Sequence, residues 1–156
     1  MFCRAFACAL PLAVLATAAI AGAESSPQDM LRGLYAGYDR THAHSNHVDV
    51  HGLMTPQLAR AYAKVTRAVP GDAPVMAWDV FVDGRNHDIE HLNLTAEADG
   101  KSRTVTAAFD NQGLPVTVVY SFARTSAGWR IDDIRYPPDR AFPKGFSLQA
   151  FAHHAG

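Results

Sequence analysis

The stretch LPVTVVYSFAR, residues 114–124, decides the fold class of this chain. It is rich in β-branched and aromatic residues, which suit a strand that is buried on at least one face. Turn signals bound it on both sides, Asn111-Gln112-Gly113 before it and Ser126-Ala127-Gly128 after it. The sequence therefore predicts a central strand that is joined to its neighbours by tight turns.

Three neighbouring segments, residues 89–98, 102–110 and 129–136, alternate apolar and polar side chains as half-buried strands do. Asp99-Gly100 stands between the first two segments and is a hairpin signal. In the last segment the phase slips by one residue at Asp132-Asp133, which predicts a β-bulge. With the central strand, these segments predict four antiparallel strands that hairpins join in chain order.

Two helical patterns come before the strands. Ser26-Pro27-Gln28-Asp29 combines a capping residue, a proline suited to the first helical position and an acid that complements the helix dipole. Apolar side chains recur at helical spacing over residues 30–38, and we expect this helix to end near His42. Thr55-Pro56 begins a second helix in the same manner, and Pro70-Gly71 should end it.

Helices that are followed by consecutive hairpin-linked strands are typical of the α+β class. We therefore predict N-terminal helices packed on the concave face of a curved four-stranded antiparallel sheet, a cone-like layer fold. Ser147 is a candidate cap for a short last helix. Residues 70–88, between helix and sheet, should form a loop around the aromatic group at residues 78–81.

The first 23 residues predict a signal peptide. Arg4 is their only charge, an apolar run covers residues 5–20, and Ala21-Gly22-Ala23 stands ahead of Glu24. The apolar run is short for a membrane span. We expect the leader to be removed and residues 24–156 to form a single α+β domain in the bacterial periplasm, with full secretion as the alternative.

Composition excludes several classes of function. Both cysteines, Cys3 and Cys8, lie in the leader, so the mature chain would have no disulfide and no thiolate chemistry. Loss of Arg4 leaves 13 basic against 15 acidic residues with no basic block, which argues against nucleic-acid binding. No second long apolar run follows, so no membrane span is expected after the leader.

Several segments resemble the exported bacterial domain-of-unknown-function family numbered 3828. The matching segments are MTPQL at residues 54–58, WDVF at residues 78–81, NHD at residues 86–88 and GWRIDDI at residues 128–134. The early tyrosine-rich helix and the short tail helix also fit. Val80 departs from the family, where proline is expected after the aspartate, and this affects the local loop shape.

The resemblance implies a cone of the nuclear-transport-factor-2-like type, with helices wrapped by a bent sheet. The broader superfamily includes isomerases, dehydratases, ligand-binding domains and immunity proteins. The fold alone therefore leaves the function open.

Histidine is the one enriched side chain with metal-binding chemistry. His42, His44, His47 and His51 fall within ten residues, and neutral imidazole binds zinc, copper or nickel. The interpretation that we favour is a solvated polar loop between two helices, in which histidine is merely tolerated. We expect no cofactor, with a transition metal at these histidines as the alternative.

Two further groups are candidates for ligand binding. Trp78, Asp79 and Phe81 combine aromatic rings with a carboxylate in a loop and are candidates for the rim of a pocket. Alternatively, the two rings close the open end of the cone as part of the core.

Asp132 and Asp133 are the second group. An aspartate that points into an apolar cone is a candidate general base. With Tyr35 or Tyr38 as proton donor, it would suit an enolising isomerase. Alternatively, the bulge turns both aspartates to solvent or onto a helix terminus.

Three hypotheses about function follow. The first is an exported, non-enzymatic binding or accessory domain that recognises an envelope protein or a small ligand, with a toxin-neutralising immunity protein as a concrete case. The second is a small isomerase-like or dehydratase-like enzyme. The third is a metal-handling protein that uses the histidine group.

Overall fold

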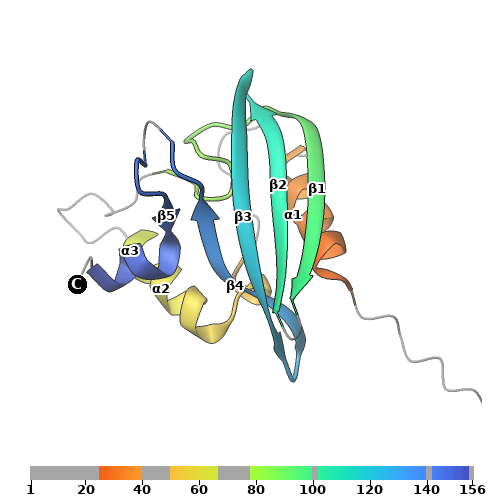
Figure 1. The fold of residues 1–156 in the computed structure, drawn as a ribbon, viewed down its shortest axis with the longest axis vertical. Helices are drawn as coiled ribbons and strands as arrows, with labels where there is room; N and C mark the ends of the chain where they lie inside the picture. The colour runs from red at the N-terminus through yellow and green to blue at the C-terminus, as the bar shows by residue number, and fades with distance from the viewer. Residues whose placement is uncertain (1–24, 40–49, 67–77, 100–101, 140–141, 155–156) are drawn as a thin grey trace, which may run out of the picture.

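The computed structural model describes residues 25–39, 50–66, 78–99, 102–139 and 142–154 of the 156-residue chain (Figure 1). The fold is α+β, with helices packed against one antiparallel sheet. The elements in chain order are α1 (Pro27–Asp39), the 3-10 helix η1 (His51–Leu53), α2 (Pro56–Thr66), β1 (Ile89–Asp99), β2 (Ser102–Asn111), β3 (Leu114–Thr125), β4 (Gly128–Tyr136), β5 (Phe146–Ser147) and α3 (Leu148–His154).

The sheet has five strands in the order β1-β2-β3-β4-β5, so each strand pairs with its neighbour in the chain. The prediction of four strands was one short. The added strand, β5, places Phe146 opposite Tyr136 and Ser147 opposite Arg135. Two residues are too few to show an alternating pattern in the sequence. They form a strand only because the folded chain pairs them with β4. The third helix also follows the sheet, so the helices are not all N-terminal.

Side-chain caps start the helices where the sequence indicates. Ser26 Oγ accepts a hydrogen bond from the Asp29 amide at 3.1 Å at the start of α1. Thr55 Oγ1 accepts one from the Leu58 amide at 3.2 Å at the start of α2. Each cap satisfies a helical N–H group that has no partner within its own helix.

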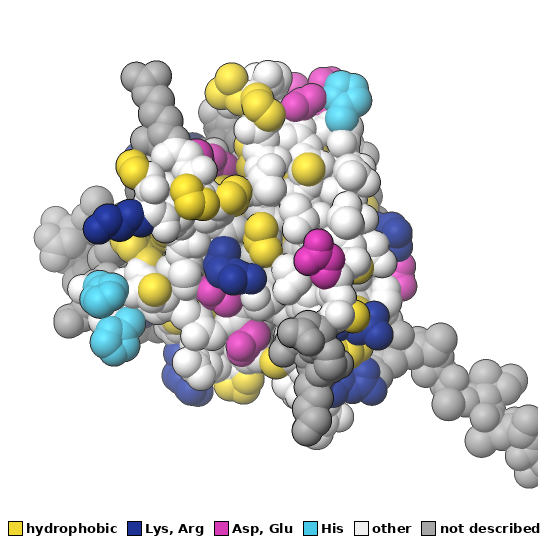
Figure 2. Space-filling view, viewed as in Figure 1, with side chains coloured by type: hydrophobic (Ala, Val, Ile, Leu, Met, Phe, Trp, Pro, Cys, Tyr) yellow, Lys and Arg dark blue, Asp and Glu magenta, His cyan; other side chains and the backbone are white. Residues whose placement is uncertain are grey.

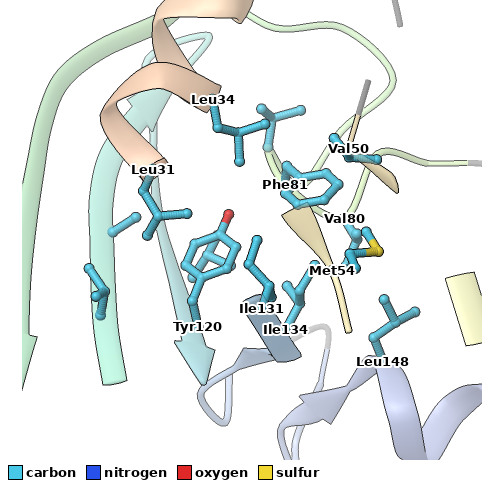
Figure 3. Packing of buried hydrophobic residues seen from close by; sticks show 14 of the residues in the cluster. Leu31, Leu34, Val50, Met54, Val80, Phe81, Tyr120, Ile131, Ile134 and Leu148 are labelled. Carbon is cyan, nitrogen blue, oxygen red and sulfur yellow. The ribbon is translucent and has the colours of Figure 1, made fainter. Parts of the chain in front are cut away.

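One face of the sheet carries the core. α1 lies behind β1 and β2 in the view of Figure 1, while α2 and α3 pack against each other beside β4. In Figure 3, Leu31 and Leu34 of α1 approach Tyr120 of β3, and Leu148 of α3 approaches the Ile134 side of the cluster. The buried apolar and aromatic positions of the strands are Val105, Ala107, Phe109, Val116, Val118, Tyr120, Phe122, Ile131, Ile134 and Tyr136.

The predicted bulge lies in β4. Tyr120 pairs with Ile134 and Phe122 pairs with Ile131, so the two aspartates between those isoleucines stand against Ser121 alone. The bulge keeps both isoleucines on the buried face despite the slip in sequence phase. None of the helices among the described residues has the length and apolar composition needed to cross a membrane.

Candidate functional site

Two of the predicted ligand residues of the aromatic group, Asp79 and Phe81, lie in a tight loop over the core, residues 79–84. The Asp79 amide donates to the Gly84 carbonyl at 2.8 Å, which closes the loop. Asp79 Oδ1 also accepts a hydrogen bond from the Phe81 amide at 2.9 Å. Val80, Phe81 and Val82 are buried, so the loop inserts its centre into the core rather than opening a pocket.

Side chains from three other elements hold the carbonyls of this loop. Tyr136 Oη donates to the Val80 carbonyl at 2.6 Å, and Tyr35 Oη donates to the Phe81 carbonyl at 3.1 Å. Asn111 Nδ2 donates to the Val82 carbonyl at 2.7 Å. Because buried carbonyls are costly without a partner, these bonds select one conformation of the loop.

Two more tyrosine hydroxyls complete the network. Tyr38 Oη donates to Asp79 Oδ2 at 2.7 Å. The hydroxyls of Tyr35 and Tyr120 share a hydrogen bond of 2.8 Å, and in Figure 3 the Tyr120 hydroxyl is directed between Leu31 and Phe81. We call Tyr35, Tyr38, Tyr120 and Tyr136 the tyrosine cluster.

Burial raises the pKa of every phenol in the tyrosine cluster well above its ordinary value, and the Asp79 carboxylate raises the pKa of Tyr38 further. The half-buried Tyr62 follows the same rule, because burial and then the charge of Asp79 raise its pKa to about 12. These phenols therefore stay protonated near neutral pH. They can donate hydrogen bonds but cannot act as bases.

Trp78 belongs to a separate aromatic cluster. Its ring centroid lies 5.5 Å from Phe146, 5.7 Å from Tyr136 and 5.9 Å from Phe142. The cluster packs the Trp78 end of the loop onto β4, β5 and the segment before β5. Trp78 and Phe81 thus serve packing, the alternative that the sequence left open beside a pocket rim.

Asp133 attaches the end of the chain to the bulge. Its carboxylate accepts hydrogen bonds from the Ile134 amide at 2.9 Å, Ser147 Oγ at 2.9 Å and the Gln149 amide at 3.2 Å. The carbonyl of Asp132 accepts from Gln149 Nε2. Asp133 therefore lies at the start of α3, away from the hydroxyls of the tyrosine cluster, and does not supply the inward base that the isomerase hypothesis requires.

The histidine group falls mostly outside the described residues, because His42, His44 and His47 lie there. His51 is exposed on η1, and its ring lies 6.0 Å from the Tyr62 ring. Within the part of the chain that the structure describes, no three His, Cys, Asp or Glu side chains gather as a metal site would require.

Sequence reasoning missed two surface cavities. One, of about 480 Å³, lies between α1 and the β3–β4 turn and is walled by Trp129. The guanidinium groups of Arg103 and Arg124 lie 5.4 and 5.3 Å from the centre of that ring system. The other, of about 500 Å³, lies where β4, β5 and α3 meet and includes Arg135 and Lys144. Alternation marks Arg135 only as a solvent-facing strand residue, so the sequence contains no signal for this cavity.

No known family model matches this chain, and no curated protein matches it. Among solved structures, the chain is similar to a chain in the crystal structure of the type VI native effector-immunity complex Tae3-Tai3 from Ralstonia pickettii. The match has a TM-score of 0.53 at 20% identity and covers 70% of this chain and 93% of that chain. At this identity the similarity concerns the fold.

Proposed function

We propose that this protein is exported and acts as a non-enzymatic binding protein whose partner is another protein. The leader pattern of residues 1–23 supports export. The use of the buried hydroxyls and of Asp133 for internal hydrogen bonds supports a non-enzymatic role. The similarity to a chain from a complex between an effector and an immunity protein supports a protein partner.

The observation that carries this proposal is an open sheet face. Helix α1 packs on one side of β1 and β2, while α2 and α3 lie beside β4. The other side of β1, β2 and β3 lies bare toward the viewer in Figures 1 and 2. Few charged side chains interrupt this area in Figure 2. We call it the threonine face, and its members are Thr95, Thr104, Thr106, Thr117, Val119 and Ser121.

Short side chains suit the threonine face to recognition. Thr95, Thr106 and Val119 stand in one cross-strand row. In the next row, Thr104 stands between Glu97 and Ser121. Small side chains and β-branched ones stiff at χ1 have little rotamer freedom to lose when a partner covers them. The hydroxyls can also adapt as donors or acceptors.

The edge of the sheet favours docking on the face rather than strand addition. Strand β1 is an outer strand, and its register shifts between Glu90 and Asn93, where His91 adopts a φ of 55°. Its outward charges include Glu97. Bulges and charges of this kind block the addition of a further strand.

An immunity protein is the concrete form of this proposal, in which the partner is an exported toxin. A toxin gene beside the gene for this protein would favour it. We also propose that the sheet and helices form a nuclear-transport-factor-2-like cone related to the family numbered 3828. The packing of α1 on β1 and β2 of one antiparallel sheet supports this. An experimental structure compared with that family would test it.

The test is crosslinking capture of the tagged full-length protein from its own cell envelope. We expect one dominant protein partner. We also expect the mass of the captured chain to match a protein whose N-terminus lies near Glu24. The paired change Thr95→Arg and Thr117→Arg puts two bulky charges on exposed positions of the threonine face and should reduce capture about tenfold or more. Gln57→Arg, at an exposed position of α2, is the matched control and should not reduce it.

Two results would contradict different parts of this proposal. Capture of no protein above background would contradict the protein partner. Equal capture by the paired variant and the wild type would contradict the threonine face as the binding surface, while leaving the partner itself established.

A further inference from the structure

The open cavity at the junction of β4, β5 and α3 has the size of a small-molecule site. Its volume is about 500 Å³, within the range usual for small ligands. The apolar wall consists of Val119, Pro138 and Phe146, and the polar groups are those of Arg135, Lys144 and Ser147. None of these groups belongs to the threonine face except Val119, which lies at its border.

Both charges at the cavity are positive. Arg135 and Lys144 line it, and no acidic residue does. Among the described residues, the ion pairs are Arg32 with Asp29 and His91 with Asp110, so neither cavity cation has a carboxylate partner there. Asp133, on the same strand, already accepts three hydrogen bonds from elsewhere.

The guanidinium of Arg135 retains an unused donor. Its Nη2 donates to Ser121 Oγ at 2.9 Å. Its Nε is buried and has no acceptor among the residues that the structure describes. A buried donor without an acceptor is costly, and a planar guanidinium can offer Nε and Nη together to one carboxylate.

We propose that this cavity binds a small free monocarboxylate on an apolar body, with Arg135 as the main donor and Lys144 as the second charge. The carboxylate supplies an acceptor for the Arg135 guanidinium, whose Nε has none among the described residues. Phe146 and Pro138 cover the apolar part of the ligand. The apolar wall favours a carboxylate that carries an organic body over inorganic phosphate, which has no apolar part to bury.

The first experiment follows the backbone amide signals of the isotope-labelled exported protein during titration with benzoate. We expect saturable shifts at Gly145, Phe146 and Ser147. Benzamide has the same ring without the charge and should bind about tenfold more weakly or worse. Inorganic phosphate should not displace benzoate. Equal binding of benzoate and benzamide, or displacement by phosphate, would overturn the proposal.

Charge variants locate the site. Arg135→Gln should weaken benzoate binding about tenfold or more, and Lys144→Gln should weaken it less, because its exposed ammonium is better solvated. Arg135→Lys keeps the charge without the planar donors and should rescue only part of the affinity. Arg60→Gln removes one charge from an exposed position of α2 and is the control. If Arg60→Gln weakened benzoate binding as much as both cavity variants, the site would be refuted. If Arg135→Gln does not fold, the comparison of Lys144→Gln with Arg60→Gln tests the site in its place.

Discussion

Single tyrosine hydroxyl groups hold the 79–84 loop in its position in the core. The buried tyrosines donate to carbonyls and a carboxylate of the 79–84 loop, which has no regular secondary structure to satisfy them. Phenylalanine would fill the same volume without the donor. The tyrosine cluster therefore combines apolar packing with hydrogen bonding at positions where both are needed.

Tyr136→Phe is the sharpest test of this arrangement. It should lower the free energy of unfolding by about 1–3 kcal/mol, because the buried Val80 carbonyl loses its donor. Urea unfolding measures the change. Tyr62→Phe is the control, since the Tyr62 hydroxyl has no partner among the described residues, and it should change stability much less. A similar loss in both variants would contradict a specific role for the hydrogen bond from Tyr136 to the Val80 carbonyl.

At the scale of elements, the bulge in β4 organises the C-terminal part of the chain. It places Asp133 where its carboxylate meets Ser147 of β5 and the Gln149 amide in the first turn of α3. A carboxylate at the start of a helix also favours its dipole. One irregularity in the sheet thereby attaches a two-residue strand and a seven-residue helix that are too short to be stable alone.

Asp133→Ala should therefore loosen β5 and α3 specifically. We expect a loss of about 1–3 kcal/mol in stability and faster amide hydrogen exchange throughout α3. Asp132→Ala is the matched control, because the Asp132 carboxylate has no hydrogen bond to a described residue. Unchanged exchange in α3 of the Asp133 variant would refute this role.

For the molecule as a whole, the two sides of the sheet differ in what covers them. One side carries the helices, the buried apolar residues and the tyrosine cluster, and the other is bare over β1, β2 and β3. Binding at the bare side needs no rearrangement of the core. The fold thus separates stability from the recognition that we propose.

Alkaline pH should unfold the molecule cooperatively. The pKa of each phenol in the tyrosine cluster is raised by burial, whereas in the unfolded chain it is near its ordinary value of about 10. The unfolded state therefore loses protons first, so this stabilising contribution is complete below about pH 10 and declines as the pH rises further. Phenolate absorbance and circular dichroism should change together. Ionisation of the cluster while the fold persists would contradict this prediction.

Local patterns were sufficient for most of the elements. Strand β3 runs from Leu114 to Thr125, against a prediction of residues 114–124, because turn residues and β-branched runs are local signals. The bulge was also predictable, since the phase slip at Asp132-Asp133 is visible in sequence. The predicted ends of the two early helices, near His42 and at Pro70-Gly71, lie outside the described residues.

The candidate sites were less predictable. Tyr35, Tyr38, Asp79 and Phe81 do come together, but as a hydrogen-bonded part of the core. β5, the Asn111 bond to the loop and the cavity with Arg135 and Lys144 had no sequence signal.

The sequence by itself determined the α+β class, the helix caps, the main strands and the bulge, because each depends on residues that are neighbours in the chain. Only the tertiary structure decided which side chains became core, which carboxylate held α3 and which cations lined a cavity. Those outcomes depend on contacts between residues as far apart as Tyr136 and Val80, and burial and hydrogen bonding at such distances arise only when the chain has folded.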